Sequence, residues 1–229
     1  MKYNQNNILR NLTFGFEIEG AFHYNLINRI RKRGADFTTD GSVDNVEDLI
    51  GRNEEGEFCE DYQEARCGVY RSLAKCLEDL RLFNQQYYRW NKTCGLHLHI
   101  GFKQKMLRLL LTDYHFLRKL LTFLKNDTCF CVAERINNSE YCYDYPRNML
   151  KFFEHWRRGF EGGEYKYRAI RNHPFRTFEI RAFAPCHHRE ANIQKVVGHI
   201  LREATKIKTT KSRNIEMVGD NFVKSSFLY

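Results

Sequence analysis

The chain has 229 residues, a formal net charge of +9 and a hydrophobic fraction of 42%. This length suits one substantial domain with its own core, and the composition is typical of a folded protein rather than a disordered one. The positive charge makes nucleic acid, acidic surfaces and phosphate-bearing ligands candidate partners without choosing among them. We therefore expect one domain over residues 1–229, whose chemistry must be read from its residue pattern.

Cysteine usage and hydropathy indicate the cellular compartment of the protein. Its 8 cysteines form no C-x-x-C pair and are few for a disulfide scaffold in a chain with ample core residues. The first ten residues contain no apolar run of the signal-peptide type. The most apolar stretch, residues 106–125, is interrupted by charged side chains such as Arg108 and Asp113, which argues against a membrane span. These features predict a cytoplasmic protein with reduced thiols and no membrane partner.

The first predicted element is a strand over "TFGFEIEG", residues 13–20, in which apolar and acidic residues alternate. The basic run at residues 29–33 is typical of a solvated loop or helix edge. "DFTTDGSV", residues 36–43, predicts a short strand entering a turn. From residue 61 to about residue 90, apolar residues recur at helical spacing and predict one long amphipathic helix, with Asp61 and Glu64 as a capping-box variant at its start.

The second half of the chain continues the mixture of strands and helices. "GLHLHIGF", residues 95–102, alternates like a strand, and residues 113–125 return to helical spacing. A short helix is expected after Pro146, two extended segments joined near residues 172–174 are expected within residues 165–183, and a last helix is expected over residues 189–206. Without regular β-α-β alternation, this order predicts an α+β fold: a mostly antiparallel sheet, helices on one face and an open polar face.

Three of the predicted strands carry ionisable residues on the side opposite their apolar residues. If the strands share one sheet, seven ionisable side chains gather on one face: Glu17, Glu19, His97, His99, Arg168, Glu179 and Arg181. Neighbours at i and i+2 on a strand lie about 7 Å apart, so paired carboxylates can serve adjacent cations. Magnesium and manganese prefer oxygen ligands with an occasional imidazole, and arginine binds phosphate in a fork. The pattern therefore predicts a metal–phosphate site.

Each motif taken alone has a simpler interpretation. A single Glu-x-Glu pair is most often a solvated strand edge, and Arg181 could simply form cross-strand pairs. Cys94 and His97 form a Cys-x-x-His pair typical of zinc sites, but no second close pair supplies the remaining ligands, and a zinc hydrolase that uses His97 and His99 stays open as a hypothesis. The net charge and the basic run at residues 29–33 keep a nucleic-acid-binding or nucleic-acid-processing protein open as well. The coincidence of three strands favours the metal–phosphate site.

The motifs "FGFEIEG", "DGS", "CGLHLHIG" and "TFEIR", in this chain order, resemble the amidoligase family of carboxylate–amine ligases, relatives of glutamine synthetase and the glutamate–cysteine ligases. The resemblance extends from about residue 13 to about residue 200. It implies a glutamine synthetase-like catalytic domain whose polar sheet face holds ATP and magnesium, with manganese as a possible substitute. It also implies formation of an amide bond between small-molecule or peptide carboxylate and amine substrates, through an acyl phosphate, with release of ADP and phosphate.

The resemblance also implies roles for individual residues. Its metal ligands correspond to Glu17, Glu19, His97 and Glu179, and these four with Arg181 form its catalytic set. The residues that it places near the ATP phosphates are His99, Arg168 and Arg181. Asp40 and Ser42 belong to the Asp-Gly-Ser element on the substrate side. One more acidic metal ligand is expected before residue 61, and "EFCEDY" offers Glu57 or Glu60 without deciding between them.

Overall fold

A computed structural model describes residues 5–39, 63–83, 88–103, 113–126, 132, 135–136, 142, 144–158, 167–173, 177–185 and 189–206. The helices are α1 (Gln5–Arg10), α2 (Tyr24–Arg31), α3 (Leu73–Leu80), α5 (Tyr114–Asn126), α7 (Met149–Arg158) and α8 (Arg189–Lys206). The strands are β1 (Leu12–Phe22), β2 (Asp36–Thr38), β3 (Gln63–Tyr70), β4 (Tyr88–Arg89), β5 (Leu96–Phe102), β6 (Ile170–His173) and β7 (Thr177–Phe183).

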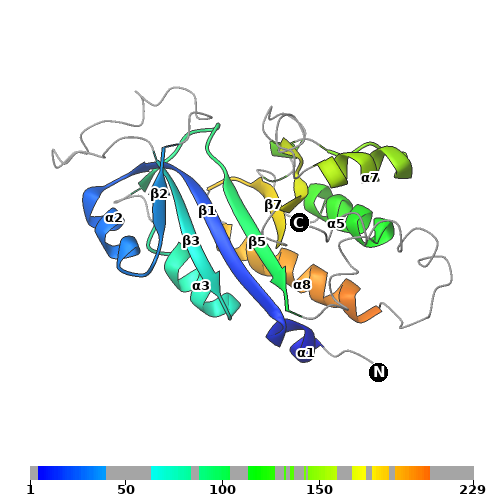
Figure 1. Ribbon diagram of the computed structural model, residues 1–229, viewed down its shortest axis with the longest axis horizontal. Coiled ribbons are helices and arrows are strands. Elements are labelled where there is room, and N and C mark those ends of the chain that lie inside the picture. The colour runs from blue at the N-terminus through cyan, green and yellow to red at the C-terminus, as the bar shows by residue number, and fades with distance from the viewer. Residues whose placement is uncertain are drawn as a thin grey trace.

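The strands form one sheet in the order β2-β3-β1-β5-β7-β6, with β4 pairing with β1 beside this path. All of the strand pairs within the described residues are antiparallel. Figure 1 shows the long β1 at the centre, with β3 and β5 on either side of it. The predicted α+β class with an antiparallel sheet is therefore confirmed, and the three strands with polar motifs, β1, β5 and β7, are neighbours in the sheet.

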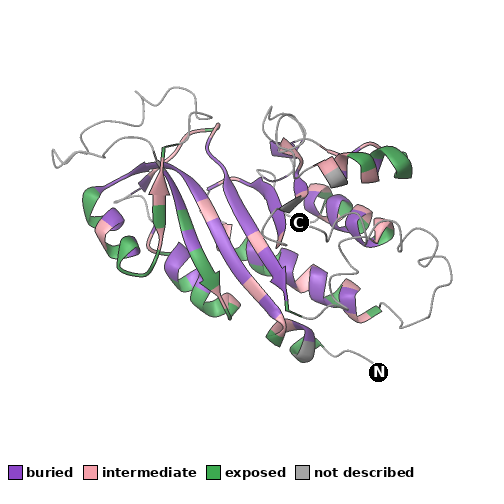
Figure 2. Ribbon diagram, viewed as in Figure 1, coloured by how far each residue is buried: buried purple, intermediate pink, exposed green. Residues whose placement is uncertain are grey.

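The apolar residues of these strands form the face of the sheet that packs in the hydrophobic core. Phe16 of β1, Leu98 of β5 and Ile180 of β7 are fully buried and lie side by side in the register. Figure 2 shows buried residues along most of β1 and β5. The helices pack on this face: α3 contacts β1 and β3, and Trp156 of α7 lies 6.1 Å from the ring of Phe178. One hydrophobic cluster joins the sheet and the helices.

The predicted helices of the second half are confirmed as α5, α7 and α8, and side-chain caps define two of their starts. Asp113 accepts a hydrogen bond from the backbone N–H of Phe116 at 3.0 Å before α5. Asn148 accepts one from the N–H of Lys151 at 3.1 Å before α7. A capping side chain satisfies a backbone donor that has no partner within the helix. The apolar residues of α5, whose spacing predicted the helix, are buried, and α5 contacts α8.

The long helix predicted over residues 61–90 is wrong in its first part and at its end. Residues 63–70 form β3, which pairs with β1 and β2, residues 88–89 form β4, and among the described residues of this range the α-helix is residues 73–80. Ser72 lies between the two elements and caps α3, because its side chain accepts a hydrogen bond from the N–H of Lys75 at 3.2 Å. Val69, one of the apolar residues at helical spacing in this range, is 79% exposed. Pairing with strands on both sides satisfies the backbone of β3 and overrides the local helical spacing.

Other expectations are confirmed in part. The β6–β7 pair confirms the two extended segments, although Tyr167–Ala169 precede β6 and residues 172–173, where the joint was predicted to begin, belong to β6. The short strand expected at residues 36–43 is β2 over its first three residues, and the remainder from Asp40 onward lies outside the described residues. Across the described ranges, no helix combines the length and the apolar character that a membrane crossing requires. Cys67, Cys76, Cys94 and Cys142 are free and buried.

The polar face of the sheet is more enclosed than the open face that the sequence predicted. Glu19, His97 and Glu179 are 3%, 2% and 0% exposed. Two features explain this burial: the long side chains of neighbouring strands pack against one another, and Arg135, from the chain between α5 and α7, contacts the backbone where β5 and β7 lie together. The sheet therefore has an apolar face covered by helices and a polar face that is largely withdrawn from bulk water.

Candidate metal-binding site on the polar face of the sheet

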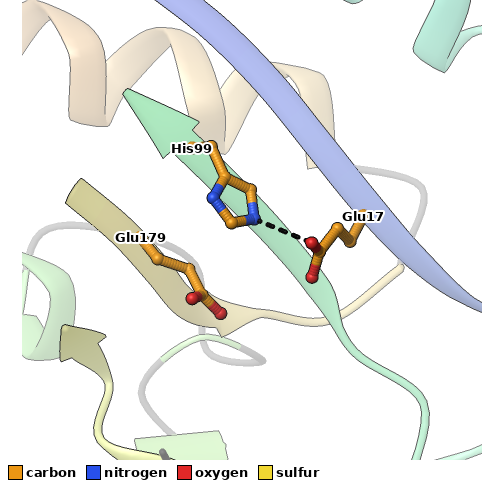
Figure 3. Close-up of side chains that lie close together, drawn as sticks. All are labelled: Glu17, His99 and Glu179. Carbon is orange, nitrogen blue, oxygen red and sulfur yellow. Dashed lines mark ion pairs between the residues drawn. The ribbon is translucent and has the colours of Figure 1, made fainter. Parts of the chain in front are cut away.

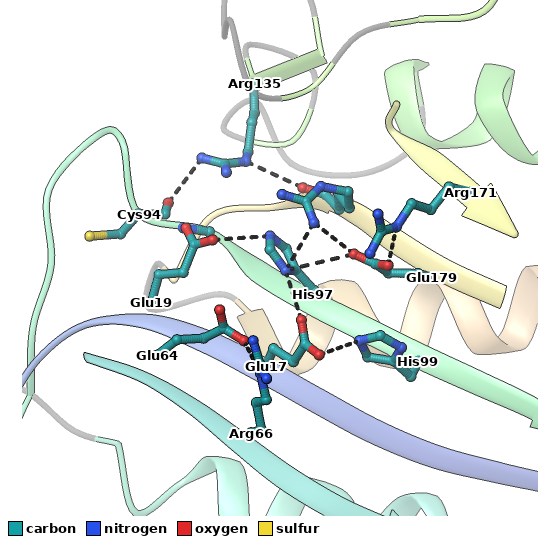
Figure 4. A network of polar contacts seen from close by, with 12 residues as sticks. Glu17, Glu19, Glu64, Arg66, Cys94, His97, His99, Arg135, Arg171 and Glu179 are labelled. Atoms are coloured by element: carbon teal, nitrogen blue, oxygen red, sulfur yellow. Dashed lines mark hydrogen bonds and ion pairs between the residues drawn. The ribbon is translucent and has the colours of Figure 1, made fainter. Parts of the chain in front are cut away.

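The strand register brings the charged side chains of β1, β5 and β7 together. Glu17 of β1 lies opposite His97 of β5, and His99 of β5 lies opposite Glu179 of β7. Because side chains alternate between the faces of a strand, these residues share the face opposite the core. Figure 4 shows them converging, with dashed contacts that connect one strand to the next. Six of the seven residues that the sequence predicted on this face are thus brought together: Glu17, Glu19, His97, His99, Glu179 and Arg181.

His97 lies at the centre of three carboxylates. Its Nδ1 is 3.4 Å from Oε2 of Glu17 and 3.7 Å from Oε1 of Glu179. Its Nε2 is 3.5 Å from Oε1 of Glu19. The imidazole is almost completely buried, so these contacts are poorly screened by water. The arrangement concentrates negative charge around one small group, which is the electrostatic condition for binding a cation.

Glu17, His99 and Glu179 form the candidate metal centre. One possible ligand atom from each of these residues lies within 4.8 Å of the other two. Figure 3 shows the three side chains directed toward one another from three adjacent strands. Two carboxylate oxygens and one imidazole nitrogen match the hard, oxygen-rich ligand sets of magnesium and manganese better than the sets of structural zinc. The residues therefore fit a divalent cation of this type.

Neighbouring charges control the protonation of the centre. Burial alone would raise the pKa of Glu17, but hydrogen bonds with His97 and His99 outweigh it and hold this pKa well below its ordinary value. Burial would lower the pKa of His99, yet its contact with Glu17 and the charge of Glu179 raise it. Glu17 is therefore ionised at neutral pH, and His99 holds its proton to a higher pH than an exposed histidine.

Glu179 is the most deeply buried carboxylate of the site, and two arginines neutralise it. Nη1 of Arg181 donates to Oε1 at 2.8 Å, and Nε of Arg171 donates to Oε2. Burial acts to raise the pKa of Glu179, but the charge of Arg181, followed by those of the histidines and Arg171, lowers it to about 2. A fully buried carboxylate thus remains charged because it is paired on both oxygens.

Arg171, and not Arg168, is the β6 arginine of the site. The sequence placed Arg168 on the polar face, but its Nη1 donates to the backbone oxygen of Asp144 and its guanidinium lies 5.5 Å from the ring centroid of Tyr145. Arg171 instead lies opposite Glu179 in the register. Within β6, buried Ile170 alternates with Arg171, and this alternation is the sequence signal for Arg171. Arg168 lies before β6, so the alternation of this strand does not apply to it.

β3 adds two residues that the sequence prediction missed. Glu64 lies opposite Glu19 and Arg66 lies opposite Glu17 in the register. Nε of Arg66 donates to Oε1 of Glu64 at 2.6 Å, while burial raises the pKa of Glu64. The assignment of Glu64 to a helix cap is therefore wrong. Glu64 is instead a strand residue whose partner across β1 and β3 is Glu19.

Four predicted site residues cannot be compared with this arrangement. The substrate-side Asp40 and Ser42 lie outside the described residues, and so do the alternative metal ligands Glu57 and Glu60. Their roles remain predictions from the resemblance. The described acid nearest in sequence to the last two is Glu64, whose position is given by the pairing of β1 with β3.

The chain preceding β5 fixes the position of Glu19. The N–H of Gly95 donates to Oε2 of Glu19 at 2.5 Å, and the N–H of Glu19 donates to the Gly95 oxygen at 3.0 Å. The hydroxyl of Tyr88 donates to the backbone carbonyl oxygen of Glu19 at 2.5 Å. The adjacent Cys94 is buried, which raises the pKa of its thiol to about 12, so in the metal-free protein it is a neutral thiol and not an activated nucleophile.

Comparison with known proteins adds no homologue to this description, because no model of a known protein family matches the chain and no curated protein matches its sequence. The chemical argument therefore depends on the geometry. The described site combines the carboxylates of Glu17, Glu19, Glu64 and Glu179 with two imidazoles and with arginines on three strands. Such a set can bind divalent cations through its acids and phosphate oxygens through its arginines.

Proposed function

We propose that this protein is an ATP- and magnesium-dependent carboxylate–amine ligase with a glutamine synthetase-like catalytic domain. The observation that carries the proposal is the convergence of Glu17, His99 and Glu179, from three neighbouring strands, within ligand distance of one cation. The antiparallel sheet with its helices on the opposite face supports the same proposal. Carboxylates beside arginines suit a nucleotide triphosphate that is bound through metal ions instead of a glycine-rich loop.

Each part of the site has a role in this reaction. Glu17, His99 and Glu179 would hold one cation, and Glu19 and His97, 3.5 Å apart, add a carboxylate and an imidazole beside it. Bound magnesium would supply charge neutralisation at the phosphates. Arg171 and Arg181 each keep further N–H donors besides those that contact Glu179, and these donors suit phosphate oxygens. The low-dielectric surroundings strengthen all of these interactions.

The proposed chemistry has two steps. An oxygen of the substrate carboxylate attacks the γ-phosphorus of ATP, the bond from that phosphorus to the bridging oxygen breaks, and ADP leaves. The amine nitrogen then attacks the acyl carbon, phosphate leaves with the oxygen that it received, and the nitrogen loses a proton. No covalent attachment to the protein is needed, which is consistent with a site built from carboxylates, imidazoles and guanidinium groups.

A metal-dependent nucleotide-binding assay tests the proposal. We expect wild-type protein to bind ATP in the presence of magnesium, and to release ADP only when a carboxylate and an amine from a substrate panel are both supplied. Glu17→Gln removes one ligand charge and should weaken magnesium-dependent ATP binding about tenfold or more. Glu203→Gln, on α8 where the partly buried Glu203 pairs with Lys119 and Lys206, is the matched control. Equal ATP affinities for wild type and Glu17→Gln would reject the proposal.

A metal-dependent nucleic-acid-processing protein is the second candidate, because the last turn of α2 presents exposed basic residues: Arg29, Arg31 and Lys32. Binding of this kind falls steeply with salt as counterions are released. Titration of DNA and RNA from about 50 to 200 mM salt separates the candidates. Binding that is lost with Arg31→Ala but retained in Glu17→Gln would favour the nucleic-acid function.

A further inference from the structure

Arg135 is a buried arginine that pairs with no carboxylate among the described residues. The residue is 6% exposed. Its Nη1 donates to the backbone oxygen of Cys94 at 2.9 Å and its Nε donates to that of Arg181 at 3.3 Å. Within the described part of the chain these two carbonyls are its hydrogen-bond partners, and it forms no ion pair there. A buried guanidinium without a direct ion-pair partner is costly, so an anionic ligand in contact with Arg135 would stabilise it.

The remaining end of Arg135 faces the metal-binding cluster. An ideal Cβ at Gly95 would lie 2.6 Å from Nη2 of Arg135, 2.8 Å from Nε2 of His97 and 3.0 Å from Oε2 of Glu19. These three polar atoms therefore surround one point beside the Gly95 backbone. Only glycine allows this approach, because any side chain would displace Arg135 or its neighbours. Figure 4 shows Arg135 above the strands, on the His97 side of the cluster.

The other arginines of the site already have counter-charges. Arg66 pairs with Glu64, and both Arg171 and Arg181 pair with Glu179. Arg135 differs from them because, in the described part of the chain, it contacts carbonyl oxygens and forms no direct ion pair. A guanidinium that is held rigidly on two backbone oxygens, with Nη2 directed at the cluster, is preorganised to receive an oxygen anion.

We propose that Arg135 binds an oxyanion at the Glu19–His97 end of the cluster, and that Gly95 is required for its position. Two sources supply such an oxygen: the terminal phosphate of a nucleotide, or the carboxylate of the second substrate. Naming these two sources rests on the proposed ligase function. The chemistry that they share is an anionic oxygen placed between the Arg135 Nη2 donor and a cation held by the acids. Because Glu19 would repel an anion, the binding requires this cation.

Calorimetric titration of the full-length chain tests the assignment. The probes are ATP, ADP, inorganic phosphate and a panel of amino acids, each with and without magnesium. We expect Arg135→Met to weaken magnesium-dependent binding of at least one probe about 10- to 100-fold, the contribution of a charge-assisted hydrogen bond. Arg135→Lys should lie between wild type and Arg135→Met, because lysine keeps the charge but lacks the fork. Arg118→Met, which removes an α5 arginine that donates to the Tyr145 oxygen, is the control.

The probes separate the two sources. Weaker binding of ATP with unchanged binding of ADP assigns Arg135 to the terminal phosphate, whereas weaker binding of an amino acid alone assigns it to the substrate carboxylate. Gly95→Ala should reproduce the loss, since its methyl group moves Arg135 away without removing its charge. This second variant keeps the test decisive if Arg135→Met unfolds.

Two results would overturn the inference. If Arg135→Lys and Gly95→Ala fold and bind every probe as wild type does, Arg135 is only a structural tie between β5 and β7. If wild-type protein binds none of the probes, both the oxyanion site and the ligase proposal are rejected. Loss of phosphate or amino-acid binding in Arg135→Met, in a protein that does not bind ATP, would retain the oxyanion site and reject the ligase.

Discussion

At the scale of single residues, cross-strand partners define the site more fully than the motifs do. A Glu-x-Glu or His-x-His motif predicts that two side chains share a face, but the partner of each is given by the register. Glu17 and His97 were predicted correctly on one face because both belong to clearly alternating strands. Glu64 escaped prediction because its segment also fits a helix, and Arg135 escaped it because the surrounding sequence has no period at all.

Replacing Glu64 tests whether β3 contributes to metal binding. Glu64 is buried opposite Glu19, burial raises its pKa, and its partner Arg66 is half exposed, so a bound metal ion would further stabilise the ionised carboxylate. We expect Glu64→Gln to reduce manganese affinity about tenfold, while the free energy of unfolding of the metal-free protein stays equal or rises. Manganese titration followed by electron paramagnetic resonance measures the affinity. With Glu203→Gln as control, equal affinities for wild type and Glu64→Gln would show that this carboxylate is not part of the metal site.

At the scale of elements, the spacing of apolar residues predicted the secondary structure correctly where a single helix or strand fills a stretch of sequence. It failed where a strand and a helix follow each other closely. The helices α5 and α8 and the strands β1, β5 and β7 have one dominant period and were predicted. Residues 63–80 combine a strand and a helix, and apolar residues from Val69 to Leu80 imitate one continuous helical stripe. The small residues of β3, such as Ala65 and Gly68, give a weak strand signal that becomes decisive only through pairing with β1.

Asp79 connects α3 to the elements around it. This residue is 5% exposed, accepts a hydrogen bond from the Tyr70 hydroxyl at 2.8 Å and pairs with Arg33. We expect Asp79→Ala to lower the free energy of unfolding by about 2 kcal/mol, because it leaves the Tyr70 hydroxyl without its acceptor. Glu78→Ala, at the adjacent exposed position, should change it by less than about 0.5 kcal/mol. Urea denaturation compares the two, and equal losses would show that Asp79 does not tie these elements together.

At the scale of the whole molecule, the sheet separates two kinds of interior. One face carries the aromatic and aliphatic core under the helices, and the other carries buried charges that neutralise one another. The general architecture followed from the sequence, since it requires only the order of elements and the polarity of their faces. The enclosure of the polar face did not, because it depends on mutual packing of long side chains and on Arg135 from a distant segment.

The charged face makes stability of the metal-free protein depend on pH in a defined direction. The pKa of Glu179 is lowered from 4.5 to about 2, so its ionised form stabilises the fold above pH 4.5 and this stabilisation disappears as the pH falls toward 2. The loss should reach about 3 kcal/mol. The raised pKa of His99 acts oppositely: its contribution is complete below the ordinary value of 6.5 and declines as the pH rises through the raised value.

Urea denaturation from pH 2 to pH 8 in the presence of a chelator separates these contributions. Glu179→Gln should be much less stable than wild type at neutral pH, because Arg171 and Arg181 lose the carboxylate that both of them contact. The two proteins should converge as the pH approaches 2, where wild-type Glu179 is itself protonated. A difference between them that stays constant through the acid range would mean that Glu179 acts through packing alone, and that the buried ion pairs do not hold the polar face together.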